Sequence, residues 1–367
     1  MKKVSLLLGI VLATSFAMAQ NVANTTQNGD HNGVEVSQQG TANLLNGTQT
    51  GDDNTAQINQ TSTGTPKNEV LIEQGGGIYE ANPGNDNIIS ATQNGKNNYA
   101  KSREYKNNNT SSITQIGDDQ YAKQWIWASG NTAIQSQTAG IGNTSEIAIN
   151  GIVGGNHATI NQVGNLNDGS IGQGWTGWNH GNNTAIISQV GDRNTVSLAD
   201  YTTFNPRLDG YTEDLNGLGI QQYGSNNEGS VSQGAIGSMV TDNNAALYQF
   251  GDDNKGLITQ ATDWNTANLI QLGISNSAEI TQESGNSNIV NLKQDGTDGE
   301  ATILQHGTGN KVKGIGIDVM ATSFDGSDLN VQQFGTTNIL NLQQADGASA
   351  TVYQNGTSNV ATVSQNQ

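Results

Sequence analysis

The chain has 367 residues, a formal net charge of -18, no cysteine and only 33% hydrophobic residues. Such an acidic chain is a poor partner for nucleic acid, whose phosphates repel it, and the absence of cysteine excludes disulfide bonds. Because aromatic residues are few and glycines number 47, an ordinary globular core is not expected, and order has to come from repetition.

Residues 1–19 are predicted to be a signal peptide. Lys2 and Lys3 give a positive start, residues 4–16 are mostly apolar, and Ala17-Met18-Ala19 has the small residues of a cleavage site. The apolar run is too short to cross a membrane as a helix. We therefore expect a secreted mature chain.

From Asn21 onward the sequence repeats a strand-like unit. The clearest sample is 243–282, where Asn and Gln each recur every eleven residues and the alternate residues between them are small or aliphatic. A period of two places these residues on one face of a β-strand. The connectors between units are rich in Gly and Asp, which suit tight turns. Two units are therefore predicted to form one 22-residue coil.

The repeat can be followed through the whole chain after the leader. It is weakest at 120–126, and all three prolines fall outside the strands, as expected because Pro cannot donate to a strand ladder. Longer connectors are expected at 61–67, 75–86, 174–182, 201–215, 234–242 and 317–326. The 28 predicted strands span 21–27, 32–38, 43–49, 54–60, 68–74, 87–93, 98–104, 109–115, 120–126, 131–137, 143–149, 156–162, 167–173, 183–189, 194–200, 216–222, 227–233, 243–249, 254–260, 265–271, 276–282, 288–294, 299–305, 310–316, 327–333, 338–344, 348–354 and 359–365.

These units predict an all-β fold: a two-sheet β-solenoid of about 14 stacked coils that fills 20–367 and is about 65 to 70 Å long. Odd-numbered strands end at one edge of the coil, so the connectors at 174–182, 201–215 and 234–242 should be neighbours.

Stacked coils place equivalent Asn and Gln amides above one another, where each can donate and accept. We find no capping segment at either end, and open sheet edges pair with other chains, so we expect end-to-end polymerisation into cross-β fibrils. The residues expected to form this stacking ladder are represented by Asn32, Gln38, Asn54, Gln60, Asn243, Gln249, Asn254, Gln260, Asn265, Gln271, Asn276, Gln282, Asn359 and Gln365.

Three stretches share a longer motif: Gln27-x-Gly29-x-x-Asn32, Gln49-x-Gly51-x-x-Asn54-x-Ala56-x3-Gln60 and Gln354-x-Gly356-x-x-Asn359-x-Ala361-x3-Gln365. This motif resembles the curlin repeat of bacterial curli subunits. The resemblance implies an extracellular functional amyloid of the biofilm matrix that contributes to surface adhesion on a Gram-negative-type bacterium. The implied partners are further copies of the chain, a curli-type outer-membrane secretion channel and a nucleator subunit.

A second hypothesis is a discrete monomeric β-solenoid that acts as an adhesin or as an ice- or glycan-binding module. It would bind with its outer face or with its edge loops. The aromatic side chains of those loops are also explained by self-packed, tolerated insertions: Trp175, Trp178, Tyr201, Phe204 and Tyr211. Trp125 and Trp127 lie in the weakest unit and are interpreted as patching a poorly matched coil, not as forming a site.

No enzyme, cofactor or metal site is expected. The four histidines, His31, His157, His180 and His306, are not grouped with a nucleophile or with zinc-ligand spacing. Turns such as 51–54 and 251–254 carry paired aspartates that suit Ca²⁺. They lack the nonapeptide spacing of calcium-binding β-rolls, so we interpret them as turn formers and charges that slow aggregation.

Overall fold

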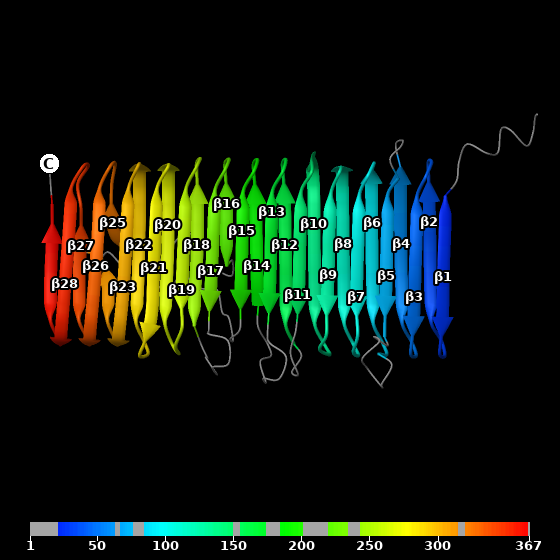
Figure 1. The fold of residues 1–367 in the computed structure, drawn as a ribbon, viewed down its shortest axis with the longest axis horizontal. Helices are drawn as coiled ribbons and strands as arrows, with labels where there is room; N and C mark the ends of the chain where they lie inside the picture. Colours follow the sequence, from blue (N-terminus) through cyan, green and yellow to red (C-terminus); the bar gives the residue numbers. More distant parts are fainter. Residues whose placement is uncertain are drawn as a thin grey trace, which may run out of the picture.

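The computed structural model describes residues 21–62, 67–75, 84–149, 155–173, 184–200, 219–233, 243–314 and 320–365. These ranges contain 29 β-strands in two parallel sheets. Figure 1 shows them side by side along a rod, with β1 at one end and β28 at the other. The prediction of an all-β, two-sheet solenoid is confirmed.

The first sheet has 14 strands, each hydrogen-bonded to its equivalent in the next coil. In order along the rod they are β1 (Val22–Asn28), β3 (Leu44–Thr50), β5 (Glu69–Gln74), β7 (Tyr99–Glu104), β9 (Tyr121–Ile126), β11 (Thr144–Ile149), β13 (Asp168–Gln173), β15 (Thr195–Asp200), β17 (Glu228–Gln233), β19 (Lys255–Gln260), β21 (Ser277–Ser284), β23 (Glu300–Thr308), β26 (Asp328–Thr336) and β28 (Ser349–Thr357).

The second sheet has 15 strands, which likewise pair with one another in parallel. Its strands are β2 (Gly33–Gln39), β4 (Thr55–Ser62), β6 (Ile88–Gly95), β8 (Thr110–Asp118), β10 (Thr132–Ile141), β12 (His157–Val163), β14 (Thr184–Val190), β16 (Ile220–Tyr223), β18 (Asn244–Phe250), β20 (Thr266–Ile274), β22 (Ile289–Thr297), β24 (Lys311–Lys313), β25 (Ala321–Ser323), β27 (Ile339–Gln343) and β29 (Val360–Ser364).

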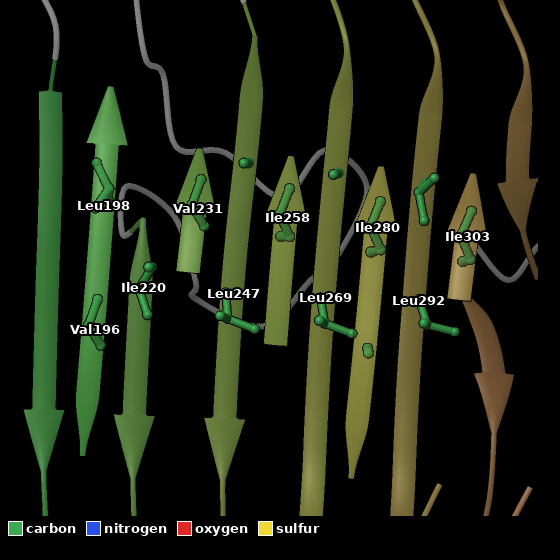
Figure 2. Packing of buried hydrophobic residues seen from close by; sticks show 14 of the residues in the cluster. Val196, Leu198, Ile220, Val231, Leu247, Ile258, Leu269, Ile280, Leu292 and Ile303 are labelled. Atoms are coloured by element: carbon green, nitrogen blue, oxygen red, sulfur yellow. The ribbon is translucent and has the colours of Figure 1, made fainter. Parts of the chain in front are cut away.

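The two sheets face each other across a core built from every second residue. In β4, Ala56, Ile58 and Gln60 are buried, whereas the residues between them point outward and are more exposed. The register is kept from coil to coil, so that Leu247 pairs with Leu269 and Leu269 with Leu292. Figure 2 shows these leucines in one row and Ile258, Ile280 and Ile303 in another. The alternation predicted from the sequence is therefore the basis of the core.

The apolar core is divided into two clusters. One extends from Leu45 to Ala122 and the other from Ile126 to Ala350, so the division falls at β9. The sequence match is also weakest there, at 120–126. The weak unit is thus a full member of the ladder whose inward side chains differ from those of its neighbours.

One level of the second sheet differs from the prediction. The strand expected at 310–316 ends at Lys313, and β25 lies inside the connector expected at 317–326. Ala321 and Ser323 of β25 pair with Leu292 and Gln294 and are fully buried. The reason is that Gly314 and Gly316 occupy the inward positions of the expected strand, and glycine has no side chain to fill the core. Residues 321–323 instead pair with the second half of β22 and fill the core there.

Most turns that join the strands repeat one backbone conformation. Gly251 has φ of +120°, and two residues later Asp253 has φ of +56°, within a degree of the φ of its equivalents Asp53 and Asp119. An added Cβ on Gly251 would lie 1.9 Å from the carbonyl oxygen of Gly273 in the next coil. Glycine is therefore required both by the positive φ and by the close approach of successive turns.

Candidate assembly site

The glutamines of successive coils form rows inside the rod. Gln249 Nε2 donates to Gln271 Oε1 at 2.8 Å, and Gln271 Nε2 donates to Gln294 Oε1 at 2.9 Å. Gln271 Nε2 also donates to the backbone oxygens of Lys255 and Asn276. Such a side-chain amide therefore joins its own coil to the next, and the Gln-to-Gln bonds of the described residues point toward the carboxyl-terminal end of the rod.

The asparagines form a second pair of rows with the opposite polarity. The backbone N–H and Nδ2 of Asn254 both donate to Asn227 Oδ1, and those of Asn276 both donate to Asn254 Oδ1. Asn254 Nδ2 also donates to Gly273 O, which fixes the turn of the following coil. These Asn-to-Asn bonds point toward the amino-terminal end. This geometry explains why the motif combines Gln, Gly and Asn at fixed spacing.

The residues predicted for the stacking ladder lie in these rows. All eight between 243 and 282 are buried, as are Asn54 and Gln60. Asn32, Gln38, Asn359 and Gln365 belong to the terminal coils and are more exposed. Asn32 Oδ1 accepts from Asn54, and Asn359 donates to Asn338 Oδ1. The asparagine row of the second sheet is thus present in both terminal coils.

The aspartates of the turns have a structural role that the sequence left open. The carboxylate of Asp52 accepts the backbone N–H of Asp30 at 2.7 Å, and that of Asp252 accepts the backbone N–H of Ser225 at 2.8 Å. Each therefore ties one turn to the equivalent turn of the neighbouring coil. Within the described ranges there is no group of three or more His, Cys, Asp or Glu that could hold a metal ion.

The two ends of the rod expose complementary groups. At the first coil, Gln27 and Gln38 donate inward to Gln49 and Gln60, which leaves their Oε1 atoms facing outward along the rod. At the last coil, Gln354 Oε1 accepts from Gln333, and among the described residues no further glutamine follows it in the row. Val34 and Val36 at one end and Ala361 and Val363 at the other are only partly buried. Both ends therefore retain the pairing capacity of an interior coil.

The glutamine row of the first sheet is interrupted at β7. Gln74 Nε2 donates to Glu104 Oε2 at 3.4 Å, and the next two members of the row are Ile126 and Ile149. Glu104 is fully buried, and its burial raises the pKa of the carboxyl to about 8. Hydrogen bonds from Ser111 and Gln74 oppose this shift but do not cancel it.

The outer face over this interruption carries the tryptophans of the weak unit. Lys123 Nζ lies 4.2 Å from the centre of the Trp125 ring and forms an ion pair with Glu146 at 2.7 Å. The ring of Trp127 packs against Tyr105, with centroids 4.4 Å apart. Both indoles thus belong to side-chain ladders on the outside of the coil and do not fill its interior.

The aromatic connector cluster lies outside the described residues. This holds for Trp175, Trp178, Tyr201, Phe204 and Tyr211 alike. The strands β13, β15 and β17, which precede these connectors, pair with one another in that order. The points at which the connectors leave the first sheet are therefore adjacent.

The eleven-residue spacing, the Gln-x-Gly-x-x-Asn turn and the paired amide rows together define the repeat. Residues 241–273 and 264–296 match the curlin associated repeat. The resemblance seen in the sequence is thereby confirmed for this segment, which includes β18 to β21 and most of β22. A comparison with curated proteins finds no match.

Curlin repeats on a β-solenoid suggest a structural subunit of the curli type and not an enzyme. Among the described residues no helix is long and apolar enough to cross a membrane. The described histidines are dispersed along the rod: His31 lies 3.7 Å from Asp53, His157 contacts Thr159, and His306 lies 3.4 Å from Glu283.

Proposed function

We propose that the protein is a self-assembling structural subunit that adds end to end into extracellular cross-β fibrils. The observation that carries this proposal is the complementarity of the two open ends. In the last coil Gln354 Nε2 donates to Ile339 O and Asn359 O and has no glutamine acceptor beyond it among the described residues, and in the first coil the Oε1 atoms of Gln27 and Gln38 have no glutamine donor. In the asparagine rows the polarity is reversed, so Asn359 would supply an acceptor for Asn32 of the next molecule.

The apolar positions of the two ends also correspond. If a second molecule continued the register, its Val34 and Val36 would lie over Ala361 and Val363, in the way that Ala56 and Ile58 lie over Val34 and Val36 within the chain. Burying such side chains stabilises by about 25 cal/mol per Å² of apolar surface. The junction between molecules would then repeat the contacts between coils, and growth would have one direction.

Secretion, a place in the biofilm matrix and a role in surface adhesion are parts of the same proposal. They are supported by the curlin repeat and by the leader-like residues 1–19. On the same basis we propose that a curli-type secretion channel and a nucleator subunit are partners. Fractionation of the source cells, with detection of fibres on the cell surface, tests this part.

End-to-end growth can be tested by placing one charge at a terminal coil. Val36→Asp puts a carboxylate on the surface that would be buried at the junction, whereas Ser37→Asp adds the same charge on the outward side of β2. We expect Ser37→Asp chains to form long dye-binding fibres with a meridional reflection at about 4.8 Å, and Val36→Asp chains to form only short fibres. Equal fibre formation by both variants, or a persistently monomeric unmodified chain, would contradict the proposal.

A further inference from the structure

The core has a polar seam between its two apolar clusters. It consists of five inward side chains on β7 to β10, all essentially buried: Ser102, Glu104, Ser111, Gln124 and Gln135. Elsewhere in the described core the middle positions of the strands are mostly Ile, Leu or Val. Gln135 Oε1 and Ser145 Oγ, which lies one level on, have no hydrogen-bond partner. The seam and the level next to it therefore contain buried polar atoms whose hydrogen-bonding capacity is not met.

Glu104 occupies a glutamine position in this seam but cannot act as glutamine does. A regular member such as Gln49 donates to backbone oxygens at Gly33 and Asn54 and to the next glutamine. Both oxygens of Glu104 accept instead, one from Ser111 Oγ at 2.5 Å and the other from Gln74 Nε2. The protonated carboxyl has one O–H that can stand in for the amide donor, and the ionised carboxylate has none.

The charged groups around Glu104 all lie on the other side of the backbone. Arg103 pairs with Glu73 at 2.8 Å, and Lys123 pairs with Glu146, both on the outer face of the sheet. The titratable and charged groups on β7 and on the strands packed against it are Glu69, Glu73, Tyr99, Lys101, Arg103, Asp118, Tyr121 and Lys123, and none of them is hydrogen-bonded to Glu104. No described cation therefore compensates an ionised Glu104 inside the core.

We propose that the polar seam is a pH-sensitive joint in the solenoid. With Glu104 protonated, the coils on the two sides of the seam stay stacked as one continuous rod. Once the seam opens to water, Glu104 loses its proton and β7 to β10 separate from the rest of the stack. The joint lies within a single chain, so it acts whether or not molecules join end to end.

The sign of the pH dependence follows from burial. In the closed seam the pKa of Glu104 is raised to about 8, whereas a solvated glutamate titrates near 4.5. Opening therefore releases a proton between these two pH values, and the opening equilibrium rises about tenfold per pH unit across that window. The closed form is fully stabilised below the lower value, and the opening equilibrium reaches a plateau above the higher one.

Hydrogen exchange of the purified chain between pH 5 and 9 tests the joint. After correction for intrinsic exchange, amides of β7 to β10 should lose protection about tenfold per pH unit up to pH 8, while those of β20 to β23 change little. Glu104→Gln restores the amide and should abolish the loss. Glu279→Gln, which alters an exposed carboxyl on β21, should leave it intact.

Two outcomes would overturn the joint. One is an equal pH response in β7 to β10 and in β20 to β23, and the other is a Glu104→Gln chain that keeps the response. A circular dichroism spectrum of Glu104→Gln at pH 5 that matches the unmodified chain establishes that the variant is folded. Ser111→Ala supplies an independent readout: it removes a donor that favours the carboxylate, so the plateau should move to higher pH.

Discussion

Replacing one glutamine of the inner rows should destabilise the rod, and two adjacent residues of β26 provide a matched pair. Gln333 is fully buried, and its Nε2 donates to Lys311 O, Asn338 O and Gln354 Oε1. Its oxygen accepts from Gln305 Nε2 at 2.8 Å. Gln332 has the same side chain but points outward. Gln333→Leu therefore removes four hydrogen bonds that Gln332→Leu leaves in place.

The expected loss can be worked out from those bonds. Four hydrogen bonds at about 1 kcal/mol each amount to about 4 kcal/mol, and the larger apolar burial of leucine returns about 2 kcal/mol. Gln333→Leu should thus lower the free energy of unfolding by about 2 kcal/mol, whereas the surface change Gln332→Leu should stay within about 0.5 kcal/mol. Urea unfolding at a protein concentration too low for fibres, followed by circular dichroism, measures both.

The row also predicts that neighbouring losses are not additive. Gln305→Leu and Gln333→Leu share the bond between them, so the double variant should be less destabilised than the sum of the two single variants by about 1 kcal/mol. Ile126 and Ile149 form such an adjacent pair in the natural row. Equal stability of the Gln332→Leu and Gln333→Leu chains, or strict additivity in the double variant, would refute the row as a source of stability.

Two further changes follow from the turns and from the net charge. Gly251→Ala should lower the free energy of unfolding by about 2 kcal/mol or more, because it combines a positive φ with a Cβ placed 1.9 Å from Gly273 O. Gly172→Ala, with open space around its Cβ, should be tolerated. Thermal unfolding compares the two chains, and an unchanged midpoint for Gly251→Ala would contradict the turn geometry. Because the chain carries a net charge of -18, added salt should shorten the lag before fibres form in a dye-binding assay, and a longer lag at high salt would argue against charge repulsion between molecules.

The strand positions and the inward faces were predictable from the sequence because both follow from one rule. A strand has a period of two, and the spacing of Asn and Gln fixes where each period begins. Even the weak unit at 120–126 keeps its register, since Ala122 and Ile126 still occupy inward positions. The regularity of the neighbours is enough to hold an irregular coil in place.

Features that depend on contacts between coils could not be predicted from the sequence. Asn and Gln each carry a donor and an acceptor, so the direction of their rows cannot be deduced from residue identity. The switch of strand from β24 to β25 arises because the strand predicted at 310–316 has glycine at two inward positions, which offer no side chain to the core. The state of Glu104 depends on burial by neighbours 30 residues away on one side and 22 on the other, at Gln74 and Ile126.

The opposed directions of the amide rows have an electrostatic consequence. Each side-chain amide is a dipole, and dipoles that align head to tail add up along a stack, as peptide units do in a helix. Here the glutamine dipoles point one way along the rod and the asparagine dipoles the other, in both sheets. Their fields largely cancel, so lengthening the rod by one coil adds hydrogen bonds without building up charge at its ends.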